Sequence, residues 1–191
     1  FTITRNGNTT QGSFSPYGNL WSNYFNNTNY LSIASTTALN LGTGSLTVEG
    51  WIYLSDTPTQ NATVASKFDS SGPYTGWALG INSSKQPYIW FGSTYLITSA
   101  SAVSVGTWNH LALVRNGTTV NLYVNGTSVG TASSSTNVDN TGTFTSGIEA
   151  GNVGGLTGYL SNVRVVKGTA VYTSNFTPST TPLTAITNTS L

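Results

Sequence analysis

The residues that could do chemistry are few in this chain and stand far apart. Its 191 residues contain five carboxylic acids, one histidine and no cysteine. Hydrolysis of a glycosidic bond needs two carboxyl groups roughly 5–9.5 Å apart, which on one strand means acids at alternate positions. No two acids stand two apart, so the sequence argues against a glycosidase. The acids are Glu49, Asp56, Asp69, Asp139 and Glu149.

The only histidine, His110, lies in the segment WNHLALVRNGTTVNLYVNG. The alternation of this segment puts Trp108, His110, Ala112 and Val114 on one face of a strand. A catalytic histidine usually stands at a loop or strand end, whereas this one lies within the strand pattern. We therefore predict that His110 packs or hydrogen-bonds within a sheet, and that the protein is not an enzyme.

Aromatic residues give the clearest sign of binding. In QPYIWFGSTYLI, Ile89 and Phe91 should face one side of a strand, and Tyr88 and Trp90 the other. Aromatic rings stack on sugar rings, and uncharged Asn, Ser and Thr side chains can bind hydroxyl groups. This pattern predicts a glycan-binding platform at Tyr88, Trp90 and Tyr95. The alternative is that both faces are buried, and that these rings fill a core.

Strands and turns must position these side chains. Short runs of β-branched and aromatic residues, bounded by Gly, Asn, Ser and Pro, recur throughout, and two Asn-Gly pairs (at 116–117 and 125–126) predict tight hairpin turns. The pattern indicates an all-β protein, an antiparallel two-sheet β-sandwich of the jelly-roll type. The clearest runs are Leu46–Leu54, Thr63–Phe68, Trp77–Ile81, Tyr88–Phe91, His110–Arg115, Thr119–Val124 and Leu160–Val166.

The composition excludes two classes of partner. Charged residues make up 6% of the chain, against about 25% in ordinary proteins, while 37% are hydrophobic. The surface is therefore expected to be covered by hydroxyl and amide groups. A net charge of +1 gives no field that would attract nucleic acid, and no apolar run approaches the roughly 18 residues of a membrane span. We expect neither nucleic-acid binding nor membrane insertion.

Several motifs together resemble the concanavalin A-like, laminin G-like domains. The segment WNHLALVRNGTTVNLYVNG looks like the central hairpin of that family, and the other motifs follow in the family's order over roughly residues 28–180. The resemblance implies a concanavalin A-like jelly roll. These other motifs are LTVEGWI (46–52), SK (66–67), GWALGI (76–81) and GYLSNVRV (158–165).

The resemblance also raises the question of calcium, which such domains often hold at a loop rim. Ca²⁺ takes six to eight oxygen ligands, usually with several carboxylates. The acids here are isolated, and Ser161-Asn162 stands where many relatives have an acidic pair. We expect no required cofactor and name Asp69 and Asp139 as the Ca²⁺ candidates. The alternative is that both are solvated loop acids that stabilise turns.

The two ends of the chain resemble the joints between tandem lectin-like units in structural and tail proteins of marine tailed phages. The segments are FTITRNG at the start and TPLTAITNTSL at the end. We divide the chain into an N-terminal strand and joint (1–27), a laminin G-like jelly roll (28–180) and a tail leading to a next repeat (181–191). The chain is then one repeat of a longer protein.

The hypothesis from sequence is a non-catalytic, lectin-like module of a phage virion or tail fibre that attaches to neutral cell-surface glycans. Its location would be the virion surface or another extracellular setting, next to neighbouring repeats or virion proteins. The alternative is a structural or decorative module, or a bacterial adhesin repeat, without glycan binding.

Overall fold

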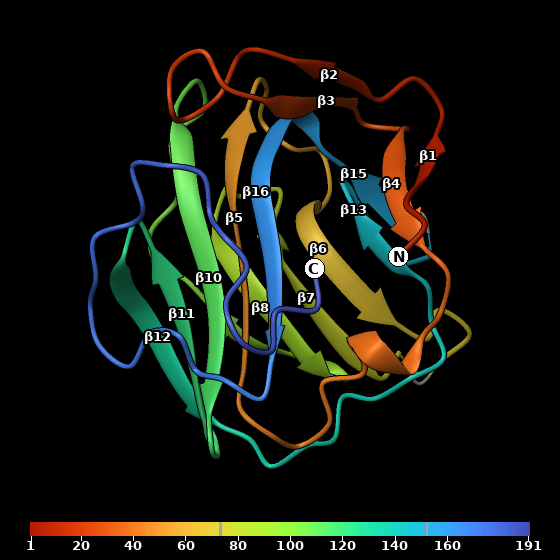
Figure 1. Cartoon of the computed structure of the whole chain (residues 1–191), viewed down its shortest axis with the longest axis vertical. Helices are drawn as coiled ribbons and strands as arrows, with labels where there is room; N and C mark the ends of the chain where they lie inside the picture. The colour runs from red at the N-terminus through yellow and green to blue at the C-terminus, as the bar shows by residue number, and fades with distance from the viewer. Residues whose placement is uncertain (73, 152) are drawn as a thin grey trace.

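Two seven-stranded antiparallel sheets face each other in a β-sandwich (Figure 1). The computed structural model describes residues 1–72, 74–151 and 153–191. Sheet A has the order β1 (Thr4–Asn6), β4 (Tyr30–Ile33), β13 (Phe144–Ser146), β6 (Ala62–Phe68), β7 (Gly76–Ile81), β8 (Pro87–Gly92) and β9 (Thr94–Thr98). Sheet B has the order β12 (Thr127–Ser133), β11 (Thr119–Val124), β10 (Trp108–Asn116), β5 (Leu46–Leu54), β16 (Thr157–Lys167), β3 (Ser22–Asn26) and β2 (Thr10–Gly12).

Little else is regular in the described part of the chain. A two-stranded ribbon, β14 (Ile148–Glu149) with β15 (Val153–Gly155), accompanies the sheets, and the helical part is the 3₁₀ turn Thr37–Leu39. No helix among the described residues is long and apolar enough to cross a membrane. The predicted all-β sandwich is confirmed. All seven strands predicted from sequence are present, and two of them, β5 and β11, have the predicted bounds.

The alternation of side chains divides each strand between the core and an outer face. Ile89 and Phe91 of β8 belong to the main core between the sheets, as do Leu111 and Leu113 of β10. Tyr88 lies in a separate cluster on the outer face of sheet A, with Trp90 packed against it. The predicted division of both strands is therefore confirmed.

The two Asn-Gly pairs form different turns. Asn125 and Gly126 have φ values of 49° and 79°, as a two-residue turn between β11 and β12 requires. In the first hairpin Asn116 instead pairs with Thr119, so Gly117 (φ 58°) and residue 118 form the loop. The prediction that Asn116 itself takes a positive φ is wrong, because the strand extends one residue further.

The C-terminal segment covers much of the outer face of sheet B. After β16 the chain crosses in front of β10 and β11 (Figure 1). Ala112, Val114 and Tyr123 pack against Ala170, Tyr172 and Phe176 of this segment. Its end returns to β16, where the Val165 backbone N–H donates to the Leu191 carbonyl. On the outer face of sheet A, the segment between β14 and β15 covers part of the area, with Ala150 packed beside Phe68, Ala78 and Tyr88.

Candidate functional site

An aromatic groove of about 300 Å³ lies on the outer face of sheet A. Phe68, Tyr74, Trp90 and Tyr95 supply its aromatic walls, and Glu149 is the charged residue among its described lining. The rings of Trp90 and Tyr95 stand 5.0 Å apart at 88°, so they form two adjoining walls of one corner. Tyr74 and Tyr95 are about half exposed, at 51% and 49%. We refer to this site as the aromatic groove.

A β-bulge brings the two main rings together. Ile89 pairs with Ile97, but the next pair is Trp90 with Tyr95, because the register between β8 and β9 shifts at this point. Bulges of this kind redirect side chains. Here the shift places Tyr95 directly opposite Trp90 on the outer face. Trp90 is also fixed by its Nε1–H, which donates to the Tyr74 carbonyl at 3.1 Å.

Glu149 provides hydrogen-bond acceptors inside the groove. Its Oε1 accepts from the Tyr88 hydroxyl and its Oε2 from Asn61 Nδ2, both at 3.0 Å. Burial raises the pKa of Glu149, and the hydrogen bonds from Asn61 and Tyr88 offset this only in part. Glu149 is 8% exposed and lines the groove, so these two hydrogen bonds hold its carboxylate at the groove wall. Asn61 Nδ2 also donates to the Tyr95 hydroxyl at 2.9 Å, which joins the acid to the aromatic wall.

The three aromatic residues predicted from sequence come together, but they do not have equal access. Trp90 and Tyr95 line the groove, whereas Tyr88 is 0% exposed and lies beneath Tyr95, with ring centres 5.2 Å apart. The expectation that Tyr88 presents its ring to a ligand is wrong. Burial raises the pKa of its hydroxyl, and that hydroxyl is used to hold Glu149. Sequence reasoning missed Glu149, because its segment reaches the groove from a distant part of the chain.

Of the two predicted calcium candidates, Asp69 stabilises its own turn and Asp139 joins two loops that are distant in sequence. Asp69 Oδ1 accepts from the Ser71 backbone N–H and hydroxyl, and these hydrogen bonds lower the Asp69 pKa. Asp139 Oδ1 accepts from the Gly42 backbone N–H at 2.6 Å. Among the described residues, no three His, Cys, Asp or Glu side chains come close enough to share a metal ion. A Ca²⁺ ion at either aspartate would therefore depend mainly on backbone, amide and water oxygens.

His110 belongs to a buried ionic network on the outer face of sheet B. Its Nε2 lies 3.1 Å from Glu49 Oε2, and Arg164 donates through Nε and Nη2 to Glu49 Oε1 at 2.9 and 2.6 Å. Tyr172 of the C-terminal segment donates to the same carboxylate at 2.8 Å. Burial alone would raise the Glu49 pKa, but the hydrogen bonds from His110 and Arg164 lower it overall. Because Glu49 is 0% exposed, the network lies where a ligand cannot reach its carboxylate.

One short segment matches the pattern of a serine hydrolase nucleophile. Residues 126–130 read GTSVG, which fits G-x-S-x-G. In hydrolases this pattern forms a sharp strand-to-helix turn. Here it forms the Asn125-Gly126 turn and the start of edge strand β12, so the serine does not stand on such an elbow.

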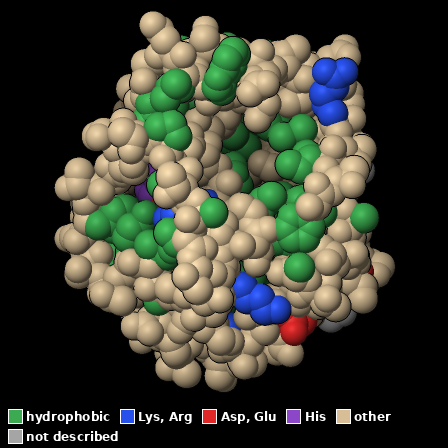
Figure 2. All heavy atoms as spheres, viewed as in Figure 1, with side chains coloured by type: hydrophobic (Ala, Val, Ile, Leu, Met, Phe, Trp, Pro, Cys, Tyr) green, Lys and Arg blue, Asp and Glu red, His purple; other side chains and the backbone are tan. Residues whose placement is uncertain are grey.

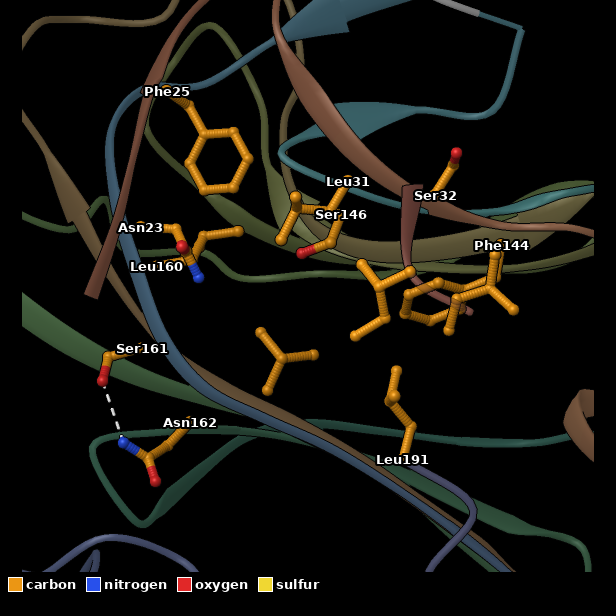
Figure 3. Close-up of a pocket in the computed structure, with 13 residues that line it drawn as sticks. Asn23, Phe25, Leu31, Ser32, Phe144, Ser146, Leu160, Ser161, Asn162 and Leu191 are labelled. Atoms are coloured by element: carbon orange, nitrogen blue, oxygen red, sulfur yellow. Dashed lines mark hydrogen bonds between the residues drawn. The ribbon is translucent and has the colours of Figure 1, made fainter. Parts of the chain in front are cut away.

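A second hollow opens between the two sheets. It has a volume of about 260 Å³, and its walls are mainly apolar side chains such as Phe25, Leu31 and Leu160. Figure 2 shows it as a depression lined by hydrophobic side chains, and Figure 3 shows Asn23, Ser161 and Asn162 along one wall. Apolar walls without an exposed aromatic face offer little to a sugar, so this crevice is not the candidate glycan site.

A further aromatic cluster lies at one end of the outer face of sheet B. Phe14 packs edge-on against Tyr53 and Tyr159, with ring centres 4.9 and 4.8 Å apart, and also contacts Trp108. Figure 2 shows hydrophobic side chains gathered at the top of this face. The Phe14 ring packs on the other three and so attaches the N-terminal segment, and Phe14 also lines a hollow of about 380 Å³ with Tyr24 and Tyr159.

Comparison with protein families identifies the class. Residues 25–172 match a laminin G-type family described as the concanavalin A-like lectin/glucanases superfamily. The match covers more than three quarters of the chain, and the protein belongs to this family. A search of curated protein sequences finds no significant match.

Solved structures share the fold at low sequence identity. Domain 4 of the extracellular arabinanase AbnA from Geobacillus stearothermophilus, in complex with arabinotriose, has a TM-score of 0.67 and 17% identity, covering 89% of this chain and 83% of that chain. A putative carbohydrate-binding protein from Bacteroides ovatus has a TM-score of 0.60 and 19% identity, and the match covers 90% of this chain and 45% of that protein. The binding domain of a botulinum neurotoxin of serotype D/C has a TM-score of 0.62 and 12% identity, and the match covers 90% of this chain and 44% of that protein. This chain thus corresponds to less than half of the last two proteins. The fold is lectin-like, and its structural neighbours include carbohydrate-binding domains.

Proposed function

We propose that the domain is a non-catalytic, lectin-like module that binds neutral cell-surface glycans in the aromatic groove. The observation that carries this proposal is the corner formed by Trp90 and Tyr95 above the acceptor Glu149. A sugar ring stacks on one aromatic wall through its C–H face, while its hydroxyl groups donate to the carboxylate. The buried negative charge also disfavours acidic sugars, so the ligand class is neutral.

Low net charge and an open groove define the binding mode. A shallow site on a chain of net charge +1 gives weak binding to one sugar, about 1 mM or roughly −4 kcal/mol, with little dependence on salt. Several linked copies would raise the avidity by roughly 10²–10⁴. The resemblance of both ends of the chain to repeat joints supports a setting with such copies, a phage virion or tail fibre exposed to the host surface. Calcium is not needed for this mode, because the groove supplies its own acceptor.

The test is binding of a multimerised domain to a glycan array and to host cells. The Trp90→Ala and Tyr95→Ala variants should lose most of the binding while keeping the parent's circular dichroism spectrum. Trp21→Ala is the matched control, because Trp21 is 61% exposed and is not part of the groove. Chelation of Ca²⁺ should leave binding unchanged. If both groove variants bind as well as the parent, the groove is not the site.

A structural module without glycan binding is the second candidate. The exposed apolar side chains Phe1, Ile3 and Trp21 favour it, at 59%, 55% and 61% exposure. Ile3 also lines the crevice between the sheets. Such side chains suit contact with a neighbouring repeat or another virion protein. Absence of binding to every glycan and host surface would leave this function in place.

A further inference from the structure

A second hollow adjoins the aromatic groove on the outer face of sheet A. It has a volume of about 360 Å³. Four residues line both hollows, so the two are contiguous rather than separate sites. The shared residues are Phe68, Ser70, Ala150 and Gly151.

The two hollows follow each other across the strands. Residues of β4 and β13 line the second hollow, and residues of β8 and β9 line the aromatic groove, with Phe68 of β6 between them. In the order of sheet A, β13 and β8 are three strand intervals apart. At a spacing of about 4.8 Å this is roughly 14 Å, which is more than one sugar ring can cover.

The boundary between the hollows is low and firmly held. Ala150 N–H donates to Ser66 Oγ at 3.0 Å, and Ser66 Oγ lies 2.8 Å from Thr145 Oγ1. Thr145 Oγ1 in turn donates to the Ile148 carbonyl at 2.9 Å, so the segment is tied down on both sides of Glu149. Three of the four shared residues, Ser70, Ala150 and Gly151, are small, and the fourth, Phe68, is buried at 7% exposure. A chain of sugars can therefore pass over the boundary without displacing a large side chain.

The chemistry of the second hollow differs from that of the first. Five of its eight described lining residues carry a hydroxyl, and none is charged. Hydroxyl groups both donate and accept, so those open to the hollow match the hydroxyl groups of a neutral sugar, whereas the Thr145 hydroxyl is already bonded to Ile148 and Ser66. The five are Tyr30, Ser32, Ser70, Thr143 and Thr145.

We propose that the two hollows form one continuous groove whose ligand is a neutral oligosaccharide of at least two units, one stacked in the aromatic groove and the next held by the hydroxyl-lined hollow. The proposal rests on the proposed function of the aromatic groove and adds the length of its ligand. The monosaccharide occupies the aromatic half. Affinity for longer ligands comes from crossing the Ser70–Gly151 boundary.

The test is a titration of the domain with cello-, malto-, manno- and xylo-oligosaccharides of one to six units, in which binding is measured by calorimetry or saturation-transfer NMR. For the series that binds, affinity should rise by about tenfold or more from one unit to two or three, and then level off. Thr143→Trp places a large ring in the second hollow; Thr143 is exposed, so the fold should tolerate the change, and it does not line the aromatic groove. This variant should keep the monosaccharide affinity and lose the gain with length.

Two further variants make the result specific. Thr143→Val removes one hydroxyl from the second hollow with little change of shape, and it should weaken only the longer ligands. Ser133→Trp on β12 of sheet B is the matched control and should bind like the parent. An affinity that does not rise with length, or a rise that survives Thr143→Trp, overturns the continuous groove while leaving the aromatic groove standing. No binding at any length, together with an unreactive glycan array, overturns the proposed function itself.

Discussion

Replacing Glu49 by glutamine perturbs a buried side chain that accepts four hydrogen bonds, with minimal change of shape. The carboxylate accepts hydrogen bonds from Arg164 at one oxygen and from His110 and Tyr172 at the other. Glutamine keeps one acceptor oxygen but places an NH₂ group at the other position, where it faces donors. It also leaves Arg164, which is 8% exposed, without its counter-charge.

The expected loss in the free energy of unfolding is about 3–5 kcal/mol, as found when one partner of a buried ion pair is removed. The free energy of unfolding of a whole domain is about 5–15 kcal/mol, so the variant should still fold but should unfold at a much lower urea concentration. Asp56→Asn is the control with the same change of charge. Asp56 is exposed, and this change should stay within about 0.5 kcal/mol.

A double-mutant cycle refines the measurement. In the Glu49→Gln background, Arg164→Gln should reduce the free energy of unfolding much less than it does in the parent protein, because the arginine no longer has a charged partner. A loss below about 1 kcal/mol for Glu49→Gln, measured by urea unfolding at pH 7, would refute the assignment of a buried ionic network.

Two further outcomes are expected. His110→Gln should reduce the free energy of unfolding by about 1–3 kcal/mol, because its bond to Glu49 is weakened, as measured by urea unfolding. Glycan binding on the array should stay intact, and loss of binding in the folded variant would contradict a structural role. Because burial raises the pKa of Glu149, binding should weaken as the pH falls through that raised value, since a protonated carboxyl has one acceptor fewer. Burial raises the pKa of the Tyr88 hydroxyl, which faces this acid, so Tyr88 does not contribute to this dependence. Glu149→Gln should therefore abolish the pH dependence of binding, and a pH dependence that persists would assign it to another group.

The stability of the domain should also decrease as the pH falls, through Glu49. Its pKa is lowered in the folded protein, so its contribution is present above the ordinary glutamate pKa and is lost as the pH falls through the folded value. Acid unfolding of the domain should therefore begin near this carboxylate.

The central strands could be predicted from sequence because their patterns are strong. In β5 and β10, apolar side chains alternate between the core and a second packed face, and both strands are rich in aromatic and β-branched residues. Strand β12 was missed, because Thr127–Ser133 is polar and largely exposed. An edge strand of Ser, Thr and Gly has the same composition as a loop, and only its pairing with β11 identifies it.

The candidate site could be predicted only in part. The alternation of β8 placed Trp90 on the outer face, and the distance in sequence between Trp90 and Tyr95 was short enough to associate them. The burial of Tyr88 follows from its contacts with Glu149, 61 residues further along the chain. Two of the partners of Glu49, Arg164 and Tyr172, are likewise more than a hundred residues away. Contacts between residues so far apart depend on the topology of the sheets, and local sequence patterns do not show which distant strands come together.

The position of β5 also determines when this domain can fold during synthesis. β5 pairs with β10 on one side and with β16 on the other, and the Glu49–Arg164 bond joins residues 115 positions apart. On a ribosome, β5 emerges first and keeps both edges unpaired until its neighbours have been made. Topologies dominated by such distant contacts fold slowly, and open strand edges invite association with other chains. A nascent chain of this domain is thus most exposed to aggregation before residues 157–167 leave the ribosome. Only after they emerge can β16 pair with the second edge of β5.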